Sequence, residues 1–212
     1  DLEAIISAIN NGSIAAKINV VLSNKENAII LERAKKHNLK AEYLSDHLIS
    51  RDQYATLLTK RFLDNNVNLI LLIGFMKILA NSFCKDWQDK IINVHPSLLP
   101  KYSGGINNDV HSQVLKNGDK ESGCTIHYVT SDVDKGPIII QKKCKVQSDD
   151  TIDSLKERVQ RLEGRAFIEA IKLKDANDDL VIPSLRKLYN VTVVGPSTFT
   201  SFLDSLLVGF ET

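Results

Sequence analysis

The sequence predicts an α/β protein whose central sheet is mostly parallel and is flanked by helices. Helical and strand patterns alternate along the chain, and residues 67–74 (VNLILLIG) and 89–95 (DKIINVH) form apolar runs with little alternation. Runs of this kind are typical of strands that helices cover on both faces, as in a parallel sheet. In such folds, ligands bind outside the carboxyl ends of the strands.

The individual elements follow from local spacing and from the residues that begin and end each segment. Apolar residues every three or four positions predict helices, and continuous or alternating β-branched and apolar residues predict strands. The first helix ends at Asn11-Gly12 and the last begins at Thr151, both ordinary helix boundaries. In chain order we predict a helix at 2–10, a strand at 17–24, a helix at 27–38, a short strand at 41–44, a helix at 51–66, strands at 67–74 and 89–95, a helix at 109–118, strands at 123–129 and 137–146, and a helix at 151–174.

The two ends of the chain depart from this regular pattern. Residue 1 stands directly at the start of a helix, although such folds usually open with a strand and a turn that often holds a phosphate. We therefore predict that the first strand is missing. Residues 1–174 would form the domain, and residues 175–212 a C-terminal extension of uncertain structure. The apolar content of this extension fits a packed strand and helix, an oligomer contact or a tail outside the domain.

Composition indicates an ordinary globular protein. The 212 residues are 43% hydrophobic and 25% charged, and 27 basic against 26 acidic residues leave a net charge of +1, too small to attract nucleic acid or an anionic membrane. Cys84, Cys124 and Cys144 have neither metal-ligand nor disulfide-framework spacing, which favours a reducing compartment and a packing role. No apolar run is long enough to span a bilayer and no export signal opens the chain, so we expect a cytoplasmic protein.

Several common catalytic motifs are absent from the sequence. Ser97 is not in a Gly-x-Ser-x-Gly elbow, and neither a P-loop nor a Gly-x-Gly-x-x-Gly segment occurs. The five histidines form no ligand cluster, so we predict no metal site. His37 and His47 lie in polar surroundings and are expected at the surface, whereas His127 could belong to the core or to a site.

Three segments with candidate functional residues come together at predicted strand ends. Asn93 and His95 are two apart in a strand and therefore point to the same side. Asp134 lies in a loop between two strands, and Gly74 begins the segment GFMKIL after another strand. Taken singly, His95 could be structural, Asp134 a turn residue and Gly74 a strand terminator. Their shared place at the carboxyl ends of strands favours a site.

This set of residues suits acyl transfer to an amine. Attack of an amine on a formyl carbon produces a negative oxygen and a positive nitrogen, which require oxyanion donors and a group that moves a proton. Asn93 can donate an N–H, and His95 can donate and shuttle a proton. Asp134, if within hydrogen-bond reach, would orient the His95 ring and raise its pKa above the usual value of about 6.5.

The quoted motifs resemble a known family. NVHPSLLPKYSGG, GFMKIL and GCTIHYVTSDVDKGPIIIQ are similar to segments of the folate-dependent formyl transferases, and GFMKIL narrows the likeness to the phosphoribosylglycinamide formyltransferases of purine biosynthesis. The resemblance runs from residue 2 to about residue 174. It implies a three-layer Rossmann-like formyltransferase fold and transfer of the formyl group of 10-formyltetrahydrofolate, the co-substrate, to the amine of glycinamide ribonucleotide.

The resemblance also implies roles for individual residues. Asn93, His95 and Asp134 match the catalytic trio, with His95 as proton donor. Positions that match the formyl-folate site are Arg51, Met76, Lys77, Ile78, Leu79, Asn93, Thr130, Ser131, Asp132, Val133 and Asp134. Positions that match the glycinamide site are Gly74, Pro96, Gln160 and Glu163. For Glu163 a solvated helix position is the plain alternative. The implied partners are these small molecules, with neither nucleic acid nor membrane, and the chain would be a monomer or a homodimer.

Some features depart from the family pattern and leave alternatives open. The phosphate loop of the family would precede Leu2, Lys77 stands where arginine is more common, and Gly164 stands where histidine usually follows Glu163. A formyltetrahydrofolate hydrolase would use the same catalytic trio to activate water, and a folate-binding remnant would bind without turnover. A methionyl-tRNA formyltransferase would need a basic surface, which a net charge of +1 does not favour.

Overall fold

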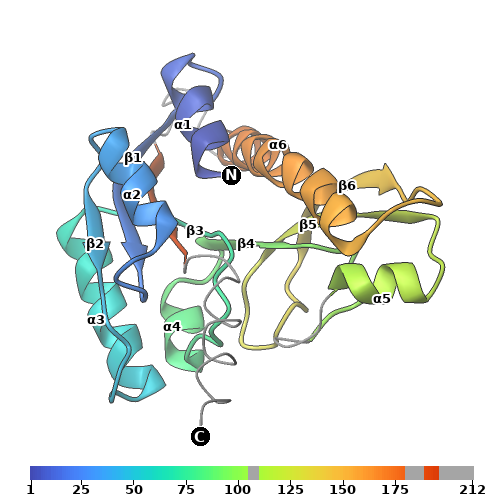
Figure 1. Ribbon diagram of the computed structural model, residues 1–212. Coiled ribbons are helices and arrows are strands. Elements are labelled where there is room, and N and C mark those ends of the chain that lie inside the picture. Colours follow the sequence, from blue (N-terminus) through green and yellow to red (C-terminus); the bar gives the residue numbers. More distant parts are fainter. Residues whose placement is uncertain (105–109, 180–188, 196–212) are drawn as a thin grey trace, which may run out of the picture.

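The computed structural model describes residues 1–104, 110–179 and 189–195 of the chain. Seven strands form one sheet in the order β2-β1-β7-β3-β4-β5-β6, with helices on both faces (Figure 1). The strands are β1 (Ala16–Ser23), β2 (Ala41–Tyr43), β3 (Leu69–Leu72), β4 (Ile91–His95), β5 (Glu121–Tyr128), β6 (Ile138–Lys145) and β7 (Tyr189–Val194). The helices are α1 (Leu2–Asn10), α2 (Ile29–Lys36), α3 (Arg51–Asp64), α4 (Asn81–Asp86), α5 (Val110–Lys116) and α6 (Ile152–Asp179).

Helices cover the sheet on both faces, which makes the predicted three layers. One core cluster joins α1, α2, α5 and α6 to one face of the sheet, and a second joins α3 and α4 to the other face. Within β3, Leu69 and Leu71 belong to the first cluster, and Ile70 and Leu72 to the second. All four side chains are therefore buried, which explains why this strand reads as an unbroken apolar run.

The sheet is parallel from β2 to β4 and antiparallel beyond β4. β1 pairs in parallel with β2 and β7, and β3 pairs in parallel with β7 and β4. β5 runs antiparallel to both β4 and β6. The predicted α/β class with a mostly parallel sheet is confirmed. Helix α4 was not expected from the sequence, because its six residues are too short for a clear helical period.

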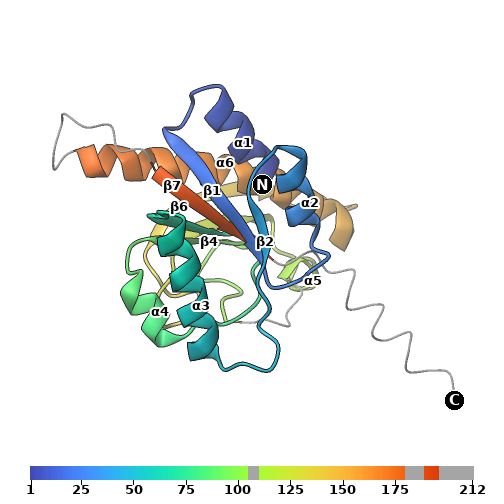
Figure 2. The same cartoon turned by 90° about the vertical axis from the view of Figure 1, so that its left-hand side faces the viewer.

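Strand β7 occupies a central place in the sheet although it is the last strand in the described part of the chain. It lies between β1 and β3 and is parallel to both, with Val191 opposite Ile18 on one side and Leu69 on the other. Figure 2 shows it beside β1. In a right-handed βαβ arrangement, a strand leading into α1 and then β1 would take this same position. In this structure β7 takes that position between β1 and β3.

The bonds of β7 are those of an interior strand. Tyr189, Val191 and Val193 are fully buried, and the buried Thr192 hydroxyl donates to the Val20 carbonyl at 3.0 Å. At its carboxyl end, Gly195 N–H donates to the Leu22 carbonyl at 3.0 Å. The sequence left the structure of residues 175–212 open, and residues 180–188 and 196–212 lie outside the described residues.

Candidate active site

A cavity of about 640 Å³ opens at the carboxyl edge of the sheet, where the fold predicts a ligand. Its walls come from the ends of β3 and β4, the segment 74–79, the loop 129–134 and one side of α6. Residues at the starts of α1, α2 and α5 also line it. Asn93, His95 and Asp134 all line this cavity, so the structure brings together the three residues that the sequence singled out.

His95 is held between two oxygen acceptors. It ends β4 and is 7% exposed. Its Nε2 lies 3.0 Å from the carbonyl oxygen of Tyr102, which can only accept, so Nε2 carries a proton. Its Nδ1 lies 3.4 Å from Oδ2 of Asp134. An oxygen acceptor therefore lies beside each nitrogen of the ring.

Asp134 is held in turn by backbone. Its Oδ2 accepts from the Gly104 N–H at 3.0 Å, and its own backbone has a φ of 56°. This left-handed conformation is tolerated by aspartate better than by most residues. Asp134 is thus a turn residue that also lines the cavity. The turn directs the carboxylate of Asp134 back toward β4.

His127 is a fourth member of the site, which the sequence left undecided. It lies on β5 directly opposite Asn93 and is 2% exposed. Burial lowers its pKa, and Nδ1–H donates to the Tyr128 carbonyl at 2.9 Å, so the neutral ring leaves Nε2 as an acceptor. Nε2 lies 3.2 Å from Nδ2 of Asn93, which therefore donates to it. Oδ1 of Asp134 is 3.7 Å from the same nitrogen, too far for a hydrogen bond, and we assign no ion pair there.

The antiparallel register of β4 and β5 brings His127 into the site. Asn93 pairs with His127, and His95 pairs with Thr125. Alternation within GCTIHYV places Thr125 and His127 on one face of β5. This alternation is visible in the sequence, but whether it places His127 in the site depends on which strand lies beside β5. Local spacing does not specify that neighbour.

A sequence profile of the protein family described as Formyl transferase matches residues 1–171 of the chain. The chain belongs to the formyl transferase family. Trifunctional purine biosynthetic protein adenosine-3 of Chironomus tentans is 39% identical over 176 residues, which cover 82% of this chain and 13% of that protein. Phosphoribosylglycinamide formyltransferase of Escherichia coli (strain K12) is 37% identical over 164 residues, which cover 77% of this chain and 76% of that protein.

Solved formyl transferase structures have the same fold. Glycinamide ribonucleotide transformylase 1 from Symbiobacterium toebii matches with a TM-score of 0.76 at 34% identity, covering 80% of this chain and 79% of that one. Phosphoribosylglycinamide formyltransferase from Coxiella burnetii, solved in complex with CHES, matches with a TM-score of 0.74 at 37% identity, covering 80% and 79%. The chain thus spans most of the length of these proteins but only a small part of the trifunctional relative.

Most positions that resemble the formyl-folate site of the formyl transferases line the cavity. The segment Met76, Lys77, Ile78 and Leu79 and the loop residues Thr130, Ser131, Asp132, Val133 and Asp134 all do so. Met76, Ile78 and Val133 are 47%, 40% and 38% exposed, which leaves apolar surface on the cavity rim. Arg51 is not among the lining residues; it is the exposed first residue of α3.

Lys77 is held by an ion pair beside the cavity. Its Nζ lies 2.9 Å from Oδ2 of Asp46, which also accepts from Nδ2 of Asn24 at 3.2 Å. Although partial burial opposes it, the hydrogen bonds from Lys77 and Asn24 leave the pKa of Asp46 below its usual value. The lysine at this position is therefore oriented by a carboxylate that stays ionised at neutral pH.

The positions that resemble the glycinamide site also line the cavity. Gly74, Pro96, Gln160 and Glu163 do so together with Arg33. Glu163 is 8% exposed, and burial raises its pKa to about 7 against the opposing effect of Lys156. Glu163 is thus a cavity residue and not a solvated helix position.

The glycine that follows Glu163 has a packing role. A Cβ built on Gly164 would lie 2.8 Å from the Cβ of Ala4, because α6 crosses α1 closely at this point. A histidine at position 164 would not fit this crossing without a shift of α1. The glycine at position 164, where the family usually has histidine, therefore allows α1 to pack closely against α6 in this chain.

No group of three or more potential metal-ligating side chains occurs within residues 1–104, 110–179 and 189–195. In the same part of the chain, no helix has both the length and the apolar character needed to cross a membrane.

Proposed function

We propose that this chain transfers the formyl group of 10-formyltetrahydrofolate to the primary amine of glycinamide ribonucleotide. The observation that carries the proposal is the convergence of Asn93, His95 and Asp134 on one cavity, with His95 between two acceptors. The names of the relatives that cover most of the chain support the same reaction.

The proposed mechanism begins with attack of the neutral amine on the formyl carbon. A C–N bond forms, and the carbonyl oxygen becomes an oxyanion that needs hydrogen-bond donors. Because Nε2 of neutral His127 accepts one N–H from Asn93, the amide is oriented with its second N–H available to the oxyanion. His127 therefore acts by determining which way the Asn93 amide points.

His95 and Asp134 handle the proton in this mechanism. Nδ1 of His95 faces Oδ2 of Asp134 at 3.4 Å, so the carboxylate orients the ring. As the bond between the formyl carbon and the folate nitrogen breaks, that nitrogen gains a proton and the attacking amine loses one. His95 relays this proton, so no net charge accumulates in the cavity.

We assign the two substrates to different parts of the cavity. The apolar rim of Met76, Ile78 and Val133, together with the polar loop that leads to Asp134, suits a flat heterocycle that carries polar edges. Gln160 and Glu163 on α6 lie with Gly74 and Pro96 on the walls assigned to the amine substrate. Arg51 does not line the cavity, and its place in the folate site stays a prediction from the resemblance.

Two alternatives use the same site without the amine substrate. A hydrolase would release formate by activating water with the same trio, and a remnant would bind formyl-folate without turnover. The cavity walls on α6, which the folate assignment does not need, favour the transferase. We further propose a cytoplasmic location, supported by three free cysteines in the described part of the chain, and a monomer or homodimer as the assembly.

The deciding experiment follows tetrahydrofolate release from 10-formyltetrahydrofolate with and without glycinamide ribonucleotide. Release that requires the amine establishes the transferase. Release at an equal rate without the amine establishes the hydrolase, and binding of formyl-folate without release establishes the remnant. His95→Ala provides the blank for uncatalysed breakdown, because it removes the proton relay.

A further inference from the structure

The loop that follows β4 contacts both members of the catalytic ion pair through its backbone. The Tyr102 carbonyl accepts from Nε2 of His95 at 3.0 Å. Two residues later, the Gly104 N–H donates to Oδ2 of Asp134 at 3.0 Å. One short piece of backbone therefore determines where His95 and Asp134 lie relative to each other.

This piece of backbone adopts a conformation that needs support from outside. Tyr102 has a φ of 62° and Gly104 a φ of 82°. Glycine adopts such angles readily, but a residue with a bulky side chain in the left-handed region costs about 1 to 2 kcal/mol. Without further contacts, the peptide around Tyr102 would relax toward ordinary angles. Its carbonyl oxygen would then move away from His95.

The support comes from the Tyr102 side chain, which leads away from the cavity. Its hydroxyl donates to Oδ2 of Asp119 at 2.8 Å and accepts from Nδ2 of Asn117 at 2.9 Å. The neighbouring Lys101 Nζ donates to the other oxygen, Oδ1 of Asp119, at 3.1 Å. Asp119 thus binds two successive residues of the loop, one with each carboxylate oxygen. A carboxylate that accepts from both keeps the loop in a single arrangement.

Asp119 is itself well anchored. It follows α5, and its N–H donates to the Val114 carbonyl at 3.2 Å in the turn that leads to β5. Hydrogen bonds from Tyr102 and then from Lys101 hold its pKa below the usual value, so the carboxylate stays charged near neutral pH. Neither Asp119 nor Asn117 lines the active-site cavity.

We infer that Tyr102 and Asp119 are positioning residues of the active site, which orient the His95 ring and the Asp134 carboxylate through the backbone of residues 102–104. The inference rests on the proposed formyl transfer for its kinetic consequence. Its geometric consequence, a fixed Nε2–H tautomer of His95, does not depend on which reaction the site performs. The two consequences can therefore be measured separately.

The test compares Tyr102→Phe with Tyr43→Phe. Tyr102→Phe keeps the ring and removes the hydroxyl, whereas Tyr43 is exposed on β2 and lies outside the cavity. We expect Tyr102→Phe to lower kcat about tenfold, since misplacement by about 1 Å can cost up to about a hundredfold. We expect KM for formyl-folate to change less than about twofold, because the apolar rim is untouched, and the acid limb of the pH–rate profile to shift. Tyr43→Phe should leave all three unchanged.

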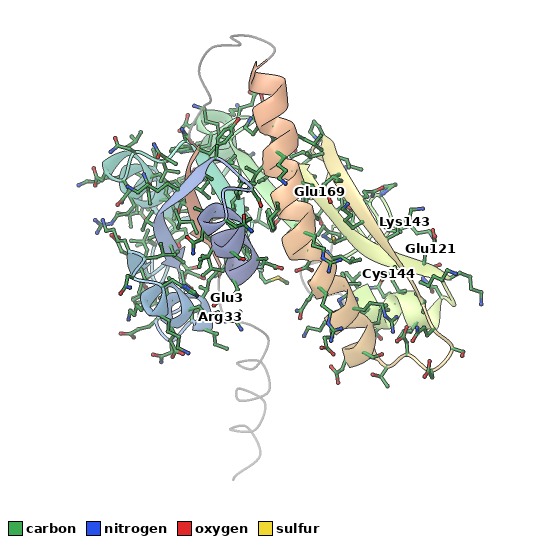
Figure 3. All side chains as sticks on the ribbon, turned by 90° about the horizontal axis from the view of Figure 1, so that it is seen from above. Glu3, Arg33, Glu121, Lys143, Cys144 and Glu169 are labelled. Atoms are coloured by element: carbon green, nitrogen blue, oxygen red, sulfur yellow. The ribbon has the colours of Figure 1, made fainter. Side chains whose placement is uncertain are left out.

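Asp119 is tested with a graded pair of variants. Asp119→Asn keeps an oxygen that accepts from Tyr102, so it should retain more activity than Asp119→Ala. Glu121→Gln is the control, because Glu121 binds Lys143 at 3.0 Å in an exposed ion pair at the outer edge of β5 and β6 (Figure 3). Equal kcat and pH profiles for Asp119→Ala and Glu121→Gln in an active enzyme would overturn the inference.

The second readout is the tautomer of His95, measured by ¹⁵N NMR of histidine-labelled protein at a pH where the ring is neutral. In the unmodified chain we expect the signature of an Nε2–H ring for His95 and of an Nδ1–H ring for His127, which serves as the internal reference. In Tyr102→Phe, we expect the ¹⁵N signals of His95 to move toward the average of the two tautomers and those of His127 to stay unchanged. If the chain proves inactive with glycinamide ribonucleotide, the proposed function fails but this readout still decides the inference. Unchanged His95 signals would overturn it.

Discussion

Replacing Glu163 with glutamine should remove a pH-dependent destabilisation of the fold. Burial raises the pKa of this carboxyl from 4.5 to about 7, and the side chain is 8% exposed on the cavity wall. The folded protein therefore holds the Glu163 proton more tightly than the unfolded chain does. Between pH 4.5 and about 7 the unfolded chain has released this proton while the folded one keeps it. Stability must fall as pH rises through this window.

The size of the effect follows from the shift in pKa. One pKa unit corresponds to about 1.4 kcal/mol, so a shift from 4.5 to about 7 corresponds to about 3 kcal/mol. Below pH 4.5 the carboxyl is protonated in both the folded and the unfolded chain, so it does not lower the free energy of unfolding. Above about pH 7 the full loss of about 3 kcal/mol is present. Glutamine has a similar shape and does not titrate. Relative to the unmodified chain, Glu163→Gln should gain about 2 to 3 kcal/mol between pH 4.5 and pH 8.

Urea unfolding of both proteins at several pH values measures this difference. Comparing the two proteins at each pH cancels the contribution of every other titrating group that the substitution leaves unchanged. Glu157→Gln is the matched control, since Glu157 lies on the same helix but is exposed and paired with Arg161. Its stability difference from the unmodified chain should stay nearly constant with pH. A Glu163→Gln difference that is equally constant would refute the raised pKa and the burial argument behind it.

Further predictions concern the trio, its supporting histidine and the last strand. Asp134→Asn should preserve formyl-folate binding in a fluorescence titration while lowering kcat at least about tenfold, and unchanged turnover would remove Asp134 from the mechanism. His127→Phe should lower kcat about tenfold or more through loss of the Asn93 amide orientation, and steady-state kinetics equal to those of the unmodified chain would contradict that role. Gly195→Ala should destabilise the fold by about 1 to 3 kcal/mol in urea unfolding, because the added Cβ would lie 2.5 Å from the Ile73 carbonyl oxygen. A urea midpoint equal to that of the unmodified chain would show that β7 does not lie between β1 and β3.

The sequence was sufficient for most of the fold, because the periods that define helices and strands are local. Residues 67–74 and 89–95 read as buried strands from their continuous apolar character, and both contain such strands in the structure. The place of Asn93 and His95 on one side of β4 followed from the two-residue repeat of an extended chain. The convergence of these residues with Asp134 was predicted from where strand ends meet in an α/β sheet.

Other features depended on which segments become neighbours. Residues 189–194 have the β-branched composition of a strand, but nothing in their spacing indicates a place between β1 and β3. The assignment of Arg51 to the folate site came from the family resemblance, and this first residue of α3 does not line the cavity. His127 and Asp119 likewise gain their meaning from contacts with residues distant in the chain.

By itself, the sequence determined the α/β class, the place of Asn93 and His95 at a strand end and the formyl transferase resemblance. These depend on residue type and on short-range spacing, which one chain displays directly. Only the tertiary structure decided that β7 lies between β1 and β3, that neutral His127 orients Asn93 and that the loop at Tyr102 connects His95 with Asp134. The physical reason is that strand pairing and loop anchoring are made by hydrogen bonds between distant segments. Such bonds leave no period in the sequence from which they could be predicted.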